Sequence, residues 1–163
     1  MIVLGIDPGF DRAGFGIVED IKGKQKLIAA GCMTTKRSES DGERLLELYK
    51  QFSQLLSSHS IDSLALESLF FTTNAKTVIG VGQARGVILL AAAQKSIPVV
   101  TYAPLQVKLA VTGYGKAEKQ QVQQMVKSIL RLPSVPKPDD AADAVAIALT
   151  HCFSYKLGAN VKW

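Results

Sequence analysis

The sequence is poor in cysteine and histidine, with two of each among its 163 residues. Cys32 and Cys152 lie far apart and lack the close spacing of metal ligands, so we expect both to be reduced thiols, as in a cytosol. His59 should end a surface helix, and His151 lies eight residues beyond Asp143. We therefore assign neither histidine to a metal.

The sequence also lacks long apolar runs, internal repeats and low-complexity linkers. No basic segment leads into a hydrophobic signal core, and the apolar run 87–93 is far too short to span a bilayer. We therefore expect residues 1–163 to form one domain of a cytoplasmic protein that does not enter a membrane. Lys and Arg outnumber Asp and Glu by 19 to 14, and the net charge of +5 favours an anionic partner without establishing nucleic-acid binding.

The order of the predicted elements indicates an α/β fold. The expected strands are 2–7, 14–18, 27–33, 63–66 and 99–102, and the expected helices are 41–58, 75–95, a short one between 104 and 113, 118–130 and 139–148. The first three strands are joined by turns and should be antiparallel, whereas the helix 41–58 should return strand 63–66 parallel to the first. Within helix 118–130, the spacing predicts that Met125 is buried and that Gln123 faces solvent.

Two of the predicted strands end on a carboxylate. Asp7 follows an apolar run and precedes the turn Pro8-Gly9, and Glu67 follows strand 63–66. Because neighbouring parallel strands lie about 4.8 Å apart, Asp7 and Glu67 can share a cation at the edge of the sheet where ligands usually bind. The alternative for Asp7 is a side chain that caps its own turn.

A further acidic motif opens the last predicted helix. Asp140 and Asp143 are three residues apart and project from one helix face, and the alanines around them allow this face to approach the sheet closely. The alternative, for Asp139 and Asp140, is a simple complement to the helix dipole. Four carboxylates at one point repel each other unless cations neutralise them. We therefore expect Asp7, Glu67, Asp140 and Asp143 to hold two Mg²⁺ ions for phosphodiester hydrolysis, a reaction in which no lysine or histidine base is required.

Six short motifs follow one another in a characteristic order and spacing. They are Gly5-Ile6-Asp7-Pro8-Gly9, Glu67 followed by Phe70, Gly82-Gln83-Ala84-Arg85-Gly86, Gln106-Val107-Lys108, Ala117-Glu118-Lys119 and Asp140-Ala141-Ala142-Asp143-Ala144. Together they resemble the RuvC family of Holliday-junction endonucleases, within the RNase H-like (retroviral-integrase) superfamily. The resemblance covers the whole chain, with one departure at Ser68, where the family commonly has Gln.

The resemblance implies a five-stranded mixed sheet, with the strands in the order third, second, first, fourth, fifth and helices on both faces. It implies a bacterial, cytoplasmic homodimer that requires Mg²⁺, for which Mn²⁺ can substitute. Its implied activity is paired nicking of four-way DNA junctions in recombination and repair, alongside the RuvA–RuvB branch-migration complex. The catalytic and metal-binding residues that it implies are Asp7, Glu67, Asp140 and Asp143.

Basic and aromatic residues in or near these motifs are candidate DNA contacts. By resemblance, phosphates would be bound by Lys108, Lys116, Lys119 and Arg85, and Phe70 would stack on a base near the cut. The alternatives are solvated surface charges for the individual lysines and packing beneath its loop for Phe70.

The predicted helix 75–95 is apolar on nearly every side and must therefore be covered on all sides. The sheet covers one face, and we expect a second copy of the protein to cover another, matching a junction that has two equivalent strands to cut. Three other functions stay open. One is an actin-like ATPase or sugar kinase, which also begins with a strand and an Asp-x-Gly turn but needs a second similar half; the others are an inactive junction-binding module and a relative that processes RNA.

Overall fold

The computed structural model describes residues 1–68 and 75–158, with side chains described at 1–68 and 78–155. Within these ranges the strands are β1 (Ile2–Asp7), β2 (Arg12–Ile21), β3 (Lys24–Thr34), β4 (Ser63–Glu67) and β5 (Val99–Tyr102). They form one sheet in the order β3-β2-β1-β4-β5. β1 and β3 are antiparallel to β2, whereas β4 is parallel to both β1 and β5. The predicted α/β fold and strand order are confirmed.

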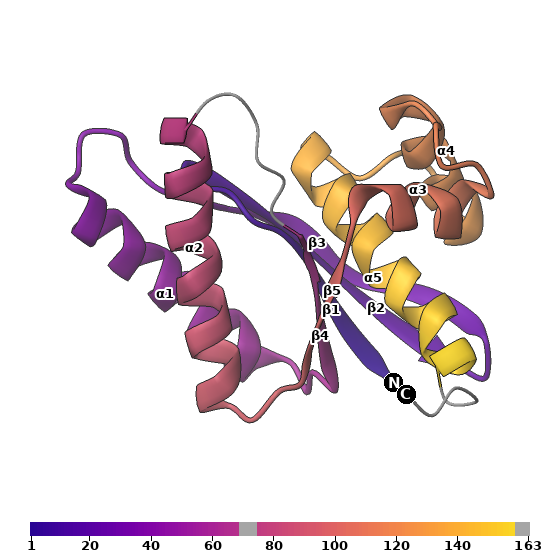
Figure 1. Ribbon diagram of the computed structural model, residues 1–163. Coiled ribbons are helices and arrows are strands. Elements are labelled where there is room, and N and C mark those ends of the chain that lie inside the picture. The colour runs from indigo at the N-terminus through magenta and orange to yellow at the C-terminus, as the bar shows by residue number, and fades with distance from the viewer. Residues whose placement is uncertain (69–74, 159–163) are drawn as a thin grey trace.

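Helices cover both faces of this sheet (Figure 1). The helices are α1 (Asp41–Ser58), α2 (Ala75–Gln94), α3 (Pro104–Thr112), α4 (Lys119–Ile129) and α5 (Asp139–Gly158). α1 and α2 pack on one face, and α5 crosses the other face with α3 and α4 packed beside it (Figure 1). No helix in the described part of the chain is long and apolar enough to cross a membrane.

The alternating side chains of β1 supply two separate cores, because successive residues of a strand point to opposite faces. Leu4 and Ile6 are fully buried in the core beneath α1 and α2, whereas Val3 is buried in the core beneath α5. Gly5 also faces α5. The alternation therefore directs Asp7, the last residue of the strand, toward the face that α5 covers.

Glycines in β1 and β2 let α5 lie directly on the backbone of the sheet. A Cβ atom built at Gly5 would overlap the carbonyl oxygen of Ala144, and one built at Gly14 would overlap the carbonyl oxygen of Asp140. Gly16, which pairs with Gly5, lies under Val145 in the same way. Any larger residue at these positions would lift the helix away, so the glycines fix how closely its acidic N-terminus approaches β1.

Local signals explain where two helices begin and end. Ser40 caps α1 through a capping box, in which its hydroxyl accepts from the amide of Glu43 at 3.4 Å and its own amide donates to the Glu43 carboxylate at 2.9 Å. Pro104 occupies the first turn of α3, and Gly113 ends it in the left-handed conformation with a φ of 75°.

Two predictions about the faces of α4 were wrong. Met125 is 38 % exposed, and Gln123 is only 8 % exposed because α4 packs against both α3 and α5. The sequence does not predict which side of α2 faces the sheet; in the structure Ala84 and Ile88 are buried, whereas Ile79 is 62 % exposed.

Candidate active site

The register of β1 and β4 places Asp7 beside Glu67. Ile6 pairs with Leu66 in a parallel ladder, so the next residue on each strand is an acid at the same edge of the sheet. Leu64 and Leu66 belong to the core under α1 and α2, and Ala65 to the core under α5. The same alternation therefore turns Glu67 toward the α5 face. The carboxyl groups of Asp7 and Glu67 share a hydrogen bond.

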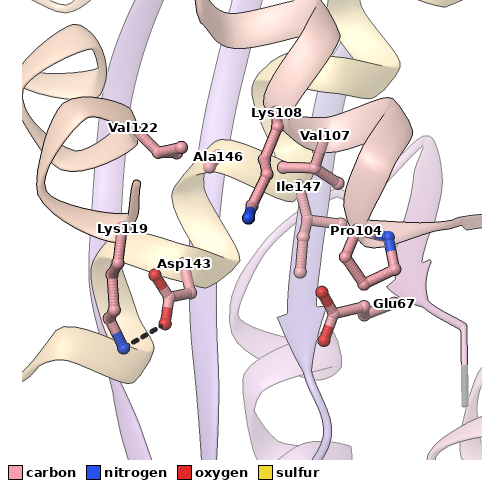
Figure 2. A pocket seen from close by; sticks show the side chains of 9 residues that line it. All are labelled: Glu67, Pro104, Val107, Lys108, Lys119, Val122, Asp143, Ala146 and Ile147. Atoms are coloured by element: carbon pink, nitrogen blue, oxygen red, sulfur yellow. Dashed lines mark ion pairs between the residues drawn. The ribbon is translucent and has the colours of Figure 1, made fainter. Parts of the chain in front are cut away.

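The first turn of α5 adds two more carboxylates to this edge. Asp140 lies directly over Gly14, which is the β2 residue that pairs with Asp7. Asp143 lies one turn further along the helix and faces the cavity that Glu67 also lines (Figure 2). The structure thus brings together all four acidic residues that the sequence singled out, from two strand ends and one helix start.

The crowding of these acids makes several of them hard to ionise. Burial raises the pKa of Asp7 to about 8, and the negative charges of Glu67, Asp143 and Asp140 add to the effect. Burial, followed by the charge of Asp143, also raises the pKa of Glu67. The pKa of Asp143 is raised by burial too, although the nearby Lys119 opposes the shift. Positive charge near these carboxylates would therefore favour their ionised forms.

Two basic side chains already supply part of that charge. Lys119 Nζ lies 2.8 Å from Asp143 Oδ2, and Arg12 Nη1 lies 3.3 Å from Asp140 Oδ2. The hydrogen bond that Lys119 donates to the Asp143 carboxylate raises the pKa of Lys119. Arg12 was missed by sequence reasoning, and no motif signals it, because its partner is 128 residues away in the chain.

The other predicted DNA-binding residues occupy different positions. Lys108, on α3, lines a cavity of about 180 Å³ together with Glu67, Asp143 and Lys119 (Figure 2). The walls of this cavity also include the apolar residues Pro104, Val107, Val122, Ala146 and Ile147. Lys116 is exposed outside that lining. Phe70 lies outside the described residues.

Arg85, on α2, is directed toward the main chain of this edge. Its Nη1 donates to the backbone carbonyl oxygen of Glu67 at 2.7 Å, and its Nη2 donates to Thr101 Oγ1 at 3.0 Å. Sequence reasoning considered Arg85 only as a phosphate contact and missed this interaction with the residue that carries a candidate metal ligand.

The donor chemistry of the four acids fits a hard divalent cation. Carboxylate oxygens are the ligands that Mg²⁺ and Mn²⁺ prefer. In the described part of the chain, no three acidic, histidine or cysteine side chains are already arranged as a metal shell. Asp140 and Asp143 instead form ion pairs with Arg12 and Lys119, each through one carboxylate oxygen.

The two histidines stand apart from this cluster, whereas Cys32 lies close to it. Burial raises the pKa of the Cys32 thiol, and the negative charges of Asp140 and Asp7 add to the effect. His59 lies at the C-cap of α1. His151 is buried in α5, where its Nδ1 is 2.8 Å from the hydroxyl oxygen of Tyr102, and burial lowers its pKa. Neither histidine therefore belongs to the acidic cluster. Cys32 and Cys152 form no disulfide bond in the described part of the chain.

Comparisons with known proteins agree with this architecture. Residues 3–151 match the family model described as crossover junction endodeoxyribonuclease RuvC. The RuvC of Desulforamulus reducens is 50 % identical over 163 residues, covering 99 % of this chain and all of the relative. The RuvC of a Roseiflexus species is 50 % identical over 151 residues, covering 93 % of this chain and 90 % of the relative.

Solved structures give the same result. T. thermophilus RuvC in complex with a Holliday junction substrate superposes with a TM-score of 0.93 at 37 % identity, covering 97 % of this chain and 96 % of that one. The yeast mitochondrial Holliday junction resolvase Ydc2 shares the fold, with a TM-score of 0.71 at 14 % identity over 97 % of this chain and 80 % of that one. The chain therefore belongs to the RuvC family of crossover junction endodeoxyribonucleases.

Proposed function

We propose that this protein resolves Holliday junctions, by nicking two opposed strands of a four-way DNA junction symmetrically during recombination and repair. The observation that carries the proposal is the meeting of Asp7, Glu67, Asp140 and Asp143 at one edge of the sheet. Membership of the RuvC family supports it. The T. thermophilus relative, solved with a Holliday junction substrate, supports the choice of DNA.

The proposal assigns two divalent cations, Mg²⁺ or in its place Mn²⁺, to these four carboxylates. Their pKa shifts support it, because burial and mutual repulsion penalise the ionised acids until positive charge arrives. When bound, such a pair activates a water molecule and stabilises the departing oxygen of a phosphodiester. No lysine or histidine is then needed as a general base.

The basic residues of the cavity have a complementary role in this proposal. The ammonium group of Lys119 lies 2.8 Å from Asp143 Oδ2, and it would be available to a phosphate of the cut strand if a cation neutralised Asp143 in its place. Lys108 enters the same cavity from α3 and holds the phosphate from the other side (Figure 2). Lys116, exposed on the loop after α3, adds a sequence-independent contact to the DNA backbone.

The proposal extends to assembly and location. A homodimer, built on the exposed apolar face of α2, presents two sites to the two equivalent strands, and Phe70 unstacks a base beside each cut. The exposure of Ile79 and Leu90 on α2 supports the dimer. The protein acts as one nuclease domain, residues 1–163, in the bacterial cytoplasm, where it works with the RuvA–RuvB branch-migration complex.

The test compares three substrates with and without Mg²⁺. Purified protein is incubated with a mobile four-way junction, a linear duplex of the same sequence and an RNA–DNA hybrid. We expect paired nicks in the junction alone, and only when Mg²⁺ is present. Cutting of the duplex or the hybrid at the rate of the junction contradicts the substrate class, and equal cutting in excess EDTA contradicts the metal requirement.

A further inference from the structure

The carbonyl group of Glu67 lies where the ladder between β1 and β4 stops. The two strands pair up to Ile6 and Leu66. In a parallel ladder, the next amide on β1 available to the carbonyl of Glu67 belongs to Pro8, and proline has no N–H. The turn that directs the chain away from Asp7 therefore deprives Glu67 of its strand partner.

Arg85 supplies the missing donor from outside the sheet. Its Nη1 donates to the Glu67 carbonyl oxygen at 2.7 Å, and its Nη2 is held by Thr101 Oγ1 of β5 at 3.0 Å. On the other side of the same peptide, the amide of Ser68 donates to the carbonyl oxygen of Tyr102 at 2.9 Å. Both polar groups of the Glu67–Ser68 peptide are thus bonded, and α2 is tied to β4 and β5 through one guanidinium.

The interaction acts on the main chain of Glu67 and not on its carboxylate. The two hydrogen bonds that Arg85 donates end on the Glu67 carbonyl oxygen and the Thr101 hydroxyl. The guanidinium therefore fixes the main-chain position from which the Glu67 side chain extends. A metal ligand displaced by more than about 0.5 Å loses productive geometry, so such an anchor matters for the site.

We propose that Arg85 is a positioning residue, which holds the backbone of Glu67 so that its carboxylate points into the cation site. This inference rests on the proposed function insofar as Glu67 is a metal ligand. It differs from the phosphate contact that the sequence suggested, because both terminal nitrogens of Arg85 are already engaged by protein oxygens. Residues that orient metal ligands typically contribute about 10-fold to 100-fold to metal affinity or activity.

The test uses Arg85→Ala, Arg85→Lys and the control Thr101→Val. Three quantities are measured: the cutting rate at saturating junction, junction affinity as a function of salt, and Mn²⁺ affinity without DNA. We expect Arg85→Ala to lower the rate and the Mn²⁺ affinity by about 10-fold to 100-fold. Junction affinity and its salt dependence should stay as in the wild type. Arg85→Lys keeps one donor, so its cutting rate and Mn²⁺ affinity should lie between those of the wild type and Arg85→Ala. Thr101→Val leaves the hydrogen bond to Glu67 in place, so it should lose less rate and less Mn²⁺ affinity than Arg85→Ala.

Chemical rescue gives a readout that a general loss of packing does not produce. Millimolar guanidinium ion should restore part of the rate of Arg85→Ala, because it can occupy the vacated site beside the Glu67 carbonyl. It should leave Glu67→Gln inactive. No rescue, in a variant whose unfolding transition matches that of the wild type, overturns the positioning role.

Other outcomes separate this inference from the function on which it rests. One such outcome is that Arg85→Ala binds the junction more weakly, with a salt dependence of affinity smaller by about one, and still cuts at the normal rate at saturation. That result would assign Arg85 to a phosphate contact and overturn the inference. Amide hydrogen exchange at Ser68 is independent of any substrate: Arg85→Ala should accelerate it, and unchanged exchange overturns the inference even if the protein cuts junctions. A wild type that cuts no junction overturns the proposed function instead, while the exchange result still decides the role of Arg85.

Discussion

Replacing Asp7 with Asn should stabilise the metal-free protein, although it removes a candidate catalytic group. The folded protein raises the pKa of Asp7 from 3.8 to about 8, chiefly by burial and then through Glu67 and Asp143. The folded state therefore holds a proton on Asp7 that the unfolded chain releases. As the pH rises from about 4 to 8, this group makes unfolding progressively easier, and above that range its effect is constant.

The size of the effect follows from the proton count. One extra proton bound by the folded state corresponds to about 1.4 kcal/mol per pH unit. Between pH 5 and pH 7 the free energy of unfolding of the wild type should thus fall by roughly 2–3 kcal/mol relative to Asp7→Asn. Comparing the two proteins cancels the titration of groups that they share.

Urea unfolding in EDTA at pH 5, 6, 7 and 8 measures this difference. A second series with Mg²⁺ should narrow the difference, because a ligand at 100 times its dissociation constant adds about 2.7 kcal/mol to the wild type and little to the variant. Parallel pH profiles in EDTA refute the argument, since they mean that Asp7 is not held protonated by its surroundings. Equal stabilisation of both proteins by Mg²⁺ refutes its role as a ligand.

Three further changes test the site, the helix contact and the assembly. Glu67→Gln should abolish cutting while junction affinity stays within about 3-fold of the wild type, because affinity comes mainly from phosphate contacts. Gel-shift and cleavage assays on one junction measure both quantities, and cutting by the variant at the wild-type rate contradicts the prediction. Gly16→Ala places a Cβ 2.8 Å from Val145 Cα, so it should displace α5, lower the free energy of unfolding by about 1–3 kcal/mol and reduce activity. The control Gly42→Ala meets no atom within 4 Å and should raise the free energy of unfolding by about 0.5–1 kcal/mol. Equal effects of the two in urea unfolding contradict the close contact of α5 with the sheet. Ile79→Lys should give a monomer that resolves junctions poorly, as measured by light scattering, and a dimer of unchanged stability contradicts the proposed interface.

The strand ends of the site were predictable because their cause is local. Runs that are apolar at every position belong to interior strands, and a crossover helix between two such runs makes them parallel. The acids that follow must then meet at one edge, as Asp7 and Glu67 do. The spacing of Asp140 and Asp143 likewise follows from the period of a helix.

The contacts between distant elements were not predictable. Glycines at positions 14 and 16 are visible in the sequence, but which helix covers them depends on the path of the chain after β5. Arg12 and Lys119 find Asp140 and Asp143 only once α5 has docked. On α4, the apolar period indicates a buried stripe, but packing against α3 and α5 sets its rotation, which is why Gln123 is buried.

The contact between Arg85 and Glu67 depends on a missing group, which explains why no motif reveals it. Pro8 is visible as a turn signal, but its lack of an amide matters only when the register with β4 is known. Arg85 then approaches from a helix 18 residues later in the chain. A contact to the backbone of a candidate ligand can be predicted only from the three-dimensional structure, whereas candidate ligands at strand ends can be predicted from the sequence.

Anomalous diffraction tests the central claim most directly. Crystals of the protein with a four-way junction that carries an uncleavable phosphate at the cut would be grown in Mn²⁺, and data collected at the manganese edge. We expect two peaks about 3.5–4 Å apart, ligated by Asp7, Glu67, Asp140 and Asp143 and bridged by an oxygen of that phosphate. A junction bound in register with no peak among these four carboxylates would contradict the account.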